Sequence, residues 1–141
     1  MKQLLKLIAA LPYSLPGKPA PVKDVIAMQQ DLKFNGLPTL PEDFVRFLHH
    51  VNTLNYDGLF IFGINSRSYF LDILSENLRL DLPQKENILI LGYDEFEYLA
   101  YCAPHACYQI IDKDTLEVVE TYADLTAAMK YLLKADDDEH L

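Results

Sequence analysis

The residues best suited to bind a metal are two cysteines and a histidine in one short segment, Cys102, His105 and Cys107. Thiolates and imidazoles are good zinc ligands, but structural zinc sites are nearly always four-coordinate, and this segment offers no fourth ligand. We expect Cys102 and Cys107 to face each other as reduced side chains across a hairpin loop. The sequence therefore predicts no bound metal and no cofactor.

Other side chains with catalytic potential lack the partners that catalysis needs. His49 and His50 are expected on a helix, where neighbouring positions point about 100° apart and cannot hold one ion together; one should border the core and the other meet solvent. Ser66, Ser68 and Ser75 do not lie in a Gly-x-Ser-x-Gly turn, and no phosphate-binding glycine loop is present. These observations predict that the protein is not an enzyme.

Two acidic and aromatic segments are candidates for binding a partner. The first runs from Tyr93 to Tyr98, and in a strand over 96–102 it would place Glu97, Leu99 and Tyr101 on one face. The second is Asn55-Tyr56-Asp57. Tyrosine supplies contact area with little loss of entropy, and carboxylates steer a basic partner. The candidate partner-binding residues are Tyr56, Asp57, Tyr93, Asp94, Glu95, Glu97 and Tyr101.

Simpler interpretations of both segments remain open. The first also fits a solvated sheet edge with tyrosines packed at its margin, and the second also fits an ordinary turn.

The charge of the chain favours a protein partner over nucleic acid. Twelve basic and 21 acidic residues give a net charge of −9, and removing the four acids of the closing run, Asp136 to Glu139, leaves −5. This charge repels phosphate backbones and attracts basic proteins. The alternative is that the negative charge only keeps the protein soluble.

The compartment follows from the cysteines and the hydrophobic segments. Two cysteines do not make a disulfide framework, so we expect a reducing cytoplasm. The first residues faintly resemble a signal peptide, but Leu4, Leu7, Ile8 and Leu11 have helical spacing and favour an amphipathic helix. No segment approaches the length of a membrane span, so no membrane contact is expected.

The hydrophobic pattern predicts a single domain over 1–141 with helices before and after a group of strands. Prolines and Gly17 make 12–21 a linker, and 135–141 is an acidic tail. The expected helices are 2–11, 22–34, 41–52, a short one at 70–80, and 123–134. The expected strands are 58–64, 87–92, 96–102, 107–112 and 116–122.

The same pattern predicts which helical residues face the core. In the third helix, Thr39 and Glu42 have the spacing of a capping box around Pro41. Pro83 is expected to end the short helix. The predicted apolar sets are Val22, Val25, Ile26 and Leu32 for the second helix, Phe44, Phe47, Leu48 and Val51 for the third, Leu71, Leu74 and Leu78 for the short one, and Leu125, Met129, Leu132 and Leu133 for the last.

This order of elements predicts an α+β fold. Consecutive strands joined by turns form an antiparallel meander sheet, and the N-terminal helices and the C-terminal helix pack on it.

Several segments together resemble a known family. An amphipathic helix ending at Asp31-Leu32 leads to Leu40-Pro41-Glu42-Asp43-Phe44 and on to Asn52. Gly58-Leu-Phe-Ile-Phe-Gly-Ile64, Leu71-Asp-Ile-Leu74 and Ile88-Leu-Ile-Leu-Gly92 follow, before a meander and a closing helix. Over 22–134 this order is similar to the SUKH superfamily, which includes fungal cell-wall-synthesis regulators of the Smi/Knr type and bacterial immunity proteins.

The chain also departs from the family pattern. Family members often have Asn-Gly directly after the third helix, whereas here Asn52-Thr-Leu-Asn-Tyr-Asp57 precedes Gly58. The helix at 2–11 is an addition to the family-like region.

The resemblance implies a binding scaffold. Bacterial SUKH proteins commonly neutralise a cognate polymorphic toxin by covering it, and the fungal members act through protein–protein contacts. We therefore expect an immunity protein whose partner is a toxin with a basic domain. A regulatory interaction module without a toxin partner is the alternative. An unrecognised hydrolase is the weakest hypothesis, because no nucleophile and base can be paired.

Overall fold

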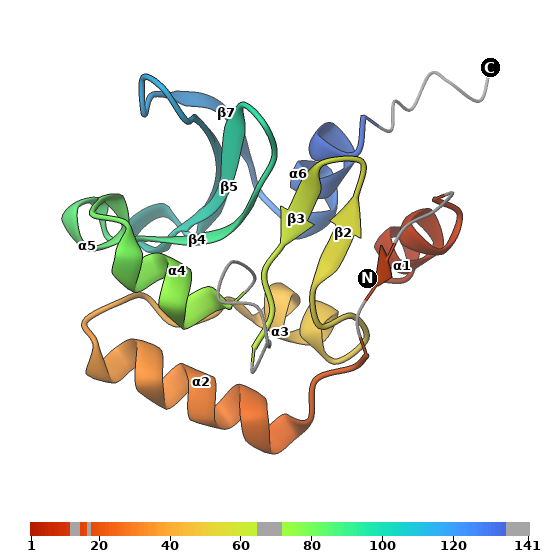
Figure 1. Ribbon diagram of the computed structural model, residues 1–141, viewed down its shortest axis with the longest axis horizontal. Coiled ribbons are helices and arrows are strands. Elements are labelled where there is room, and N and C mark those ends of the chain that lie inside the picture. Colours follow the sequence, from red (N-terminus) through yellow and green to blue (C-terminus); the bar gives the residue numbers. More distant parts are fainter. Residues whose placement is uncertain (12–14, 17, 65–71, 135–141) are drawn as a thin grey trace.

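The strands of the computed structural model form one antiparallel sheet in which each strand pairs with its neighbours in sequence (Figure 1). The structure describes residues 1–11, 15–16, 18–64 and 72–134. The strands are β1 (Leu15–Pro16), β2 (Leu54–Tyr56), β3 (Leu59–Ile61), β4 (Ile88–Tyr93), β5 (Glu97–Cys102), β6 (Cys107–Asp112) and β7 (Val118–Tyr122). The expected meander is confirmed.

Helices precede, interrupt and follow this sheet, which confirms the α+β class. They are α1 (Lys2–Ala9), α2 (Val22–Phe34), α3 (Glu42–Leu48), α4 (Ile73–Arg79), α5 (Leu82–Glu86) and α6 (Leu125–Leu132). A short 3-10 helix, η2 (Ala103–His105), joins β5 to β6. None of the helices in the described ranges has the length and apolar character needed to cross a lipid bilayer.

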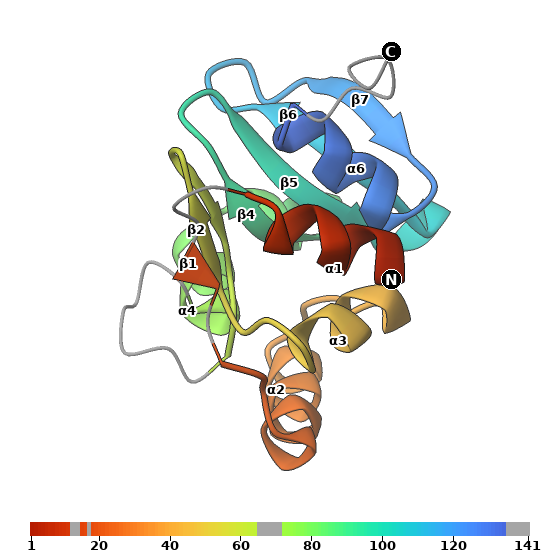
Figure 2. The same ribbon diagram turned by 90° about the vertical axis from the view of Figure 1, so that its right-hand side faces the viewer.

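The helices cover the two faces of the sheet unequally. Figure 2 shows α1 beside α6, and α6 packs on β6 and β7. On the other face, α4 and α5 pack on β4. Leu99 and Ala100 in β5 point to opposite faces and both are fully buried, so the sheet is covered on both sides at its centre.

The core follows the predicted apolar stripes of α3 and α6. Phe44, Phe47 and Leu48 are fully buried, and Val51 just after α3 is buried with them. Their burial stabilises the fold because apolar surface leaves water, and α6 contributes in the same way. Its buried residues include Leu125, Met129 and Leu132, and Leu133 follows at the core margin.

Three side-chain amides act in place of a neighbouring strand. Each one donates a hydrogen bond to the carbonyl of a distant residue and accepts one from the N–H of the same residue. The pairs are Gln29 with Leu40 (3.0 and 2.6 Å), Asn52 with Ile64 (2.9 and 2.8 Å) and Asn77 with Ile90 (2.8 and 2.7 Å). They satisfy backbone groups that would be costly to bury unpaired.

The expected linker at 12–21 is in part a strand. Leu15 and Pro16 form β1 and pair with Asn55 and Leu54 at the edge of the sheet, where a proline is tolerated because its missing N–H leaves no gap in the ladder. Further along, Ala20 N–H donates to the Leu48 carbonyl at 2.8 Å. The linker interpretation is therefore corrected for these residues, because local proline content does not show which backbone groups find partners.

The predicted capping box at the start of α3 is wrong. The helix begins after Pro41, whose backbone is extended, and no side chain caps it. It ends at Leu48, short of the expected boundary, so His49 and His50 lie in the turn that follows. His49 is half-buried, with Nδ1 3.3 Å from the Ala20 carbonyl oxygen, and His50 is exposed, which confirms the expected division between them.

The buried face of α2 differs from the prediction. Val25 and Leu32 are buried as expected, but Val22 and Ile26 are exposed, and Met28 takes the position between the two buried residues. A stripe at i, i+3 and i+7 is narrower than the predicted set, because the helix contacts the rest of the protein along one side only.

The buried face of α4 is also different. The helix buries Ile73, Glu76 and Asn77, while Leu78 is 48% exposed and Leu74 is half-buried. Leu71 lies outside the described residues. The amide of Asn77 forms two hydrogen bonds with the backbone of Ile90. These bonds turn Asn77 towards the core, whereas hydropathy alone predicted that Leu78 would be buried.

The prediction that Pro83 ends the short helix is wrong, because α4 already ends at Arg79. Pro83 lies in the first turn of α5, where a missing N–H costs little.

Candidate functional site

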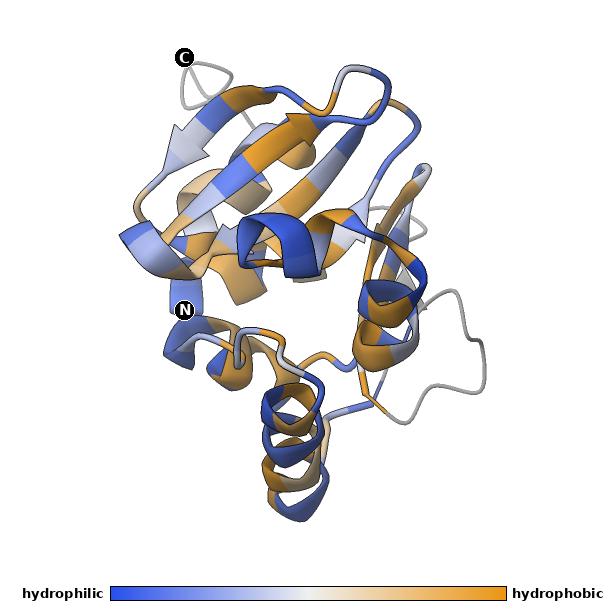
Figure 3. Cartoon of the chain, turned by 90° about the vertical axis from the view of Figure 1, so that its left-hand side faces the viewer, coloured by the Kyte–Doolittle hydropathy of each residue, from blue (hydrophilic) through white to orange (hydrophobic). Residues whose placement is uncertain are grey.

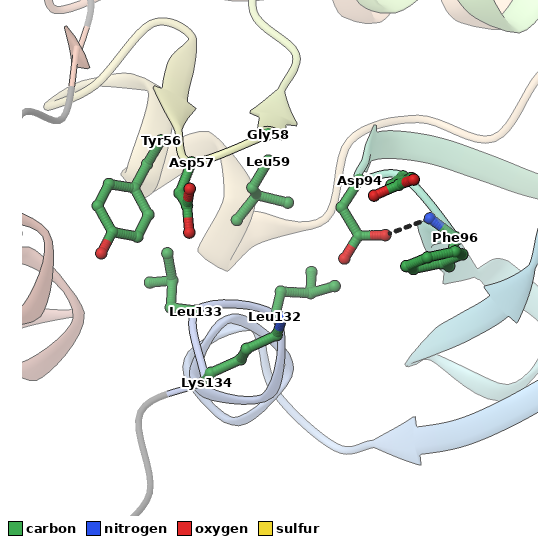
Figure 4. Close-up of a pocket in the computed structure, with 10 residues that line it drawn as sticks. Tyr56, Asp57, Gly58, Leu59, Asp94, Phe96, Leu132, Leu133 and Lys134 are labelled. Carbon is green, nitrogen blue, oxygen red and sulfur yellow. Dashed lines mark hydrogen bonds between the residues drawn. The ribbon is translucent and has the colours of Figure 1, made fainter.

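Two hairpin turns and the end of α6 enclose a groove of about 280 Å³ (Figure 4). One turn joins β2 to β3 and the other joins β4 to β5. We call this the tip groove, and its rim and floor include Tyr56, Asp57, Asp94, Glu95, Phe96 and Leu133. It is the first candidate site because two sequence-predicted segments meet in it.

The β2–β3 turn is a two-residue hairpin loop. Tyr56 pairs with Leu59, and the residues between them, Asp57 and Gly58, have φ values of 47° and 85°. Two consecutive left-handed residues are typical of a type I′ turn, for which Asp-Gly is a preferred sequence. The sequence prediction missed β2 and began the strand at Gly58, although the Asp-Gly pair was the available signal.

The β4–β5 turn is held by the side chain of Asp94. Its Oδ1 accepts the N–H groups of Phe96 at 3.0 Å and Glu97 at 2.9 Å. Lys113 donates from Nζ to the Asp94 carbonyl at 3.1 Å, and its backbone N–H donates to the Phe96 carbonyl at 2.9 Å. This framework holds Phe96 outward with 68% of its surface exposed.

Phe96 is a groove residue that the sequence interpretation missed. It was placed inside a strand, on the face opposite Glu97, whereas β5 begins at Glu97. The available signal was Asp94 two residues before it, because aspartate often closes a turn on its own backbone.

Four of the predicted binding residues come together in the tip groove. Tyr56 and Asp57 approach from one hairpin and Asp94 from the other (Figure 4). Glu95, the next residue after Asp94, also lines the groove.

Tyr93, Glu97 and Tyr101 lie outside the groove. The Tyr93 ring packs on Phe60 with centroids 5.5 Å apart, and partial burial raises the pKa of its phenol. Lys113 Nζ lies 4.6 Å from the centre of the same ring, a cation–π contact.

The face shared by Glu97, Leu99 and Tyr101 is not an open surface, contrary to expectation. Leu99 is fully buried, Glu97 accepts hydrogen bonds from the Tyr131 hydroxyl of α6 at 3.0 and 3.1 Å, and Tyr101 packs on Tyr108 with centroids 5.4 Å apart. The strand alternation was predicted correctly, but only tertiary packing shows that α6 covers this face.

The electrostatics of the tip groove are negative. Asp57, Asp94 and Glu95 face one cation, Lys134, among the lining residues. The C-terminal end of α6 adds the negative end of its helix dipole. Leucines from β3 and α6 supply apolar lining, so the groove combines carboxylates with apolar surface. Such a lining suits Lys or Arg, whose aliphatic stems bury while their charged ends remain paired.

The two cysteines and Ser75, which were considered as metal ligands or nucleophiles, do not line the tip groove. Cys102 and Cys107 pair in register across β5 and β6, as expected, and both are free thiols. Burial and the neighbouring Cys102 raise the pKa of the Cys107 thiol. In the described part of the chain, no three His, Cys, Asp or Glu side chains cluster as metal ligands. Ser75 lies in α4, and Ser66, Ser68 and the tail at 135–141 lie outside the described residues.

The fold and this groove define the chain as an α+β meander domain with an acidic, partly apolar groove at its hairpin tips. No protein-family model matches the chain, and no curated protein has significant sequence similarity to it. The resemblance to the SUKH superfamily stays a prediction.

Proposed function

We propose that this protein is a non-enzymatic binding domain whose tip groove takes a basic segment of a protein partner. The observation that supports this function is the meeting of Tyr56 and Asp57 with Asp94, Glu95 and Phe96 in one groove. These residues belong to two segments that are well separated in the sequence.

The groove has the two properties that such a site needs. Its carboxylates attract a basic partner over a distance and speed the encounter. Phe96 and Tyr56 then offer aromatic surface, which contributes strongly to binding when a partner buries it. Part of the aromatic area is already in water, because Phe96 is 68% exposed.

The identity of the partner rests on the resemblance to SUKH proteins. This resemblance favours a cognate polymorphic toxin as the partner. On this proposal the chain is an immunity protein that acts in the cytoplasm. A regulatory interaction module is the alternative. An adjacent toxin gene favours the first, since immunity genes normally lie beside their toxins.

The test is co-expression with a neighbouring toxin-like gene, followed by binding measurements on the purified pair. We expect Asp57→Asn, Asp94→Asn and Glu95→Gln together to slow association and flatten its salt dependence. The amides keep side-chain shape, and the amide at position 94 retains the oxygen that closes its turn. Phe96→Ser should speed dissociation, because it removes contact area rather than charge.

A matched control separates this site from general charge. Asp24→Asn, Asp31→Asn and Glu42→Gln change the net charge equally, but lie on α2 and α3. Growth protection and association should then stay close to wild type. Equal effects of the two triple variants contradict a role for the groove. If no neighbouring gene encodes a binding partner, the regulatory interaction module becomes the favoured function.

A further inference from the structure

A second groove lies on the sheet face opposite α6, between α5 and the β6–β7 hairpin. It consists of two adjoining hollows of about 340 and 230 Å³, which share Leu82 and Leu116 in their linings. Figure 3 looks towards this side, with hydrophobic segments visible on the strands beyond α5. We call it the sheet-face groove.

Its lining is mainly apolar, and the groove is open to solvent because the helices do not cover this face of the sheet completely. α4 and α5 pack on β4, whereas α6 packs on β6 and β7 from the other side. Ile88 and Ile111 line the groove from β4 and β6. Val118 and Leu116 stand at its outer side, and each is 49% exposed. Association with a partner would remove this apolar surface from water.

The backbone at Leu116 is unusual and sets its side chain at the groove. Its φ is 61°, in the left-handed region that bulky side chains rarely adopt. Asp112 holds this turn, because its Oδ1 accepts the N–H groups of Asp114 at 2.8 Å and Thr115 at 2.9 Å. Glycine suits this backbone without strain. The turn therefore places the Leu116 side chain where it lines both hollows.

Charge selects among the possible occupants. Asp81 and Glu86 line the hollows, and neither Lys nor Arg is among the lining residues in the described ranges. A second copy would bring the same acids and a net charge of −9 against this surface. A segment with positive charge beside aliphatic side chains complements both the acids and the apolar lining.

We propose that the sheet-face groove binds a segment of a protein partner in which aliphatic side chains alternate with Lys or Arg. The aliphatic side chains enter the hollows on either side of Leu116, and the basic groups pair with Asp81 and Glu86. This surface is separate from the tip groove, so one partner contacting both would meet two sides of the domain.

The test uses the full chain and a synthetic peptide that alternates leucine and lysine, followed by methyl NMR. We expect saturable shifts centred on the methyl groups of Leu82, Ile88, Ile111, Leu116 and Val118. A peptide with glutamate in place of lysine should bind at least about tenfold more weakly, and so should one with serine in place of leucine.

Leu116→Gly is the informative variant because it removes the side chain where the backbone suits glycine. The lysine peptide should lose at least about tenfold in affinity, while the methyl spectrum of the core stays folded. Val22→Ser is the control, since it removes an exposed aliphatic side chain from α2. Its affinity should equal that of the wild type.

Several outcomes overturn the proposal. Absence of saturable shifts, equal binding of the glutamate peptide, or unchanged affinity of a folded Leu116→Gly each does so. Shifts confined to the tip groove assign the peptide there instead. A molecular mass that rises with protein concentration in the wild type but not in Leu116→Gly makes a second copy the occupant.

Discussion

The phenol of Tyr108 donates a hydrogen bond to the carboxylate of Asp43, which also accepts the N–H of Leu125 at 3.0 Å. One side chain of α3 therefore connects β6 to the first residue of α6. The pKa of the Tyr108 phenol lies far above its ordinary value, and burial is the largest cause, with this hydrogen bond the next. The carboxylate occurs within Leu40-Pro41-Glu42-Asp43-Phe44, so this segment joins the helical layer to the sheet.

Tyr108→Phe should lower the free energy of unfolding by about 1.5–3 kcal/mol, because it removes a hydrogen bond to a charged acceptor. Urea unfolding measures the change. Tyr101→Phe is the control, since its ring contacts Tyr108 but its hydroxyl has no hydrogen bond to the described residues. Equal losses in the two variants contradict a special role for the bond to Asp43.

Asn77→Leu should cost about 2–5 kcal/mol, although leucine is similar in size and apolar. The substitution leaves the buried N–H and carbonyl of Ile90 without the partner that the amide provides. Gln30→Leu makes a comparable amide-to-leucine change on the exposed side of α2 and should cost much less. A stabilised Asn77→Leu protein shows instead that Ile90 finds other partners.

Phe47→Ala should cost roughly 3–5 kcal/mol, because the ring is fully buried between α3 and the rest of the core. Lys33→Ala, at an exposed position of α2, should change stability by no more than about 0.5 kcal/mol. Thermal unfolding of both variants provides the comparison. Equal melting temperatures contradict the assigned core face.

The contact between Tyr131 and Glu97 should be visible at alkaline pH. Burial, and then the hydrogen bond to Glu97, raise the pKa of Tyr131 from 10.0 to about 12. Folding therefore favours the neutral phenol. The stabilisation is complete below pH 10 and is lost as the pH rises from 10 to about 12.

Glu97→Gln should move ionisation of this phenol to lower pH, as followed by phenolate absorbance. Glu95→Gln removes the same charge at an exposed turn residue and should leave the titration unchanged. If both variants titrate like the wild type, Glu97 does not govern the Tyr131 proton.

The cysteine pair should bind no stoichiometric zinc, since Cys102, His105 and Cys107 lack a fourth ligand. Elemental analysis of the purified protein measures the metal content. Cys102→Ser with Cys107→Ser should leave the chain folded, as checked by circular dichroism. About one zinc per chain, with unfolding on chelation, contradicts this prediction.

Much of the strand order was predictable because it depends on local patterns. β6 has the expected bounds of Cys107 and Asp112, and Cys102 pairs with Cys107 as the short loop between them indicated. The apolar stripe of α3 was also predictable, since helical period alone brings Phe44, Phe47 and Leu48 to one side.

The candidate site was predictable in its pieces but not in its assembly. The sequence identified Tyr56, Asp57, Asp94 and Glu95 as acidic and aromatic candidates. Their meeting depends on the register of two hairpins and on where α6 ends. Glu97 appeared equivalent to them along the chain, but packing of α6 directs it to Tyr131.

By itself, the sequence determined the α+β class, the meander and the acidic, aromatic character of its turns, because these properties arise from residues close together in the chain. The tertiary structure decided the rotation of α4 and the face of the sheet left open beside Leu116. Both depend on contacts between distant segments. A buried backbone group must find a partner wherever the fold brings one, as Ile90 does with Asn77, and local periodicity does not specify that partner.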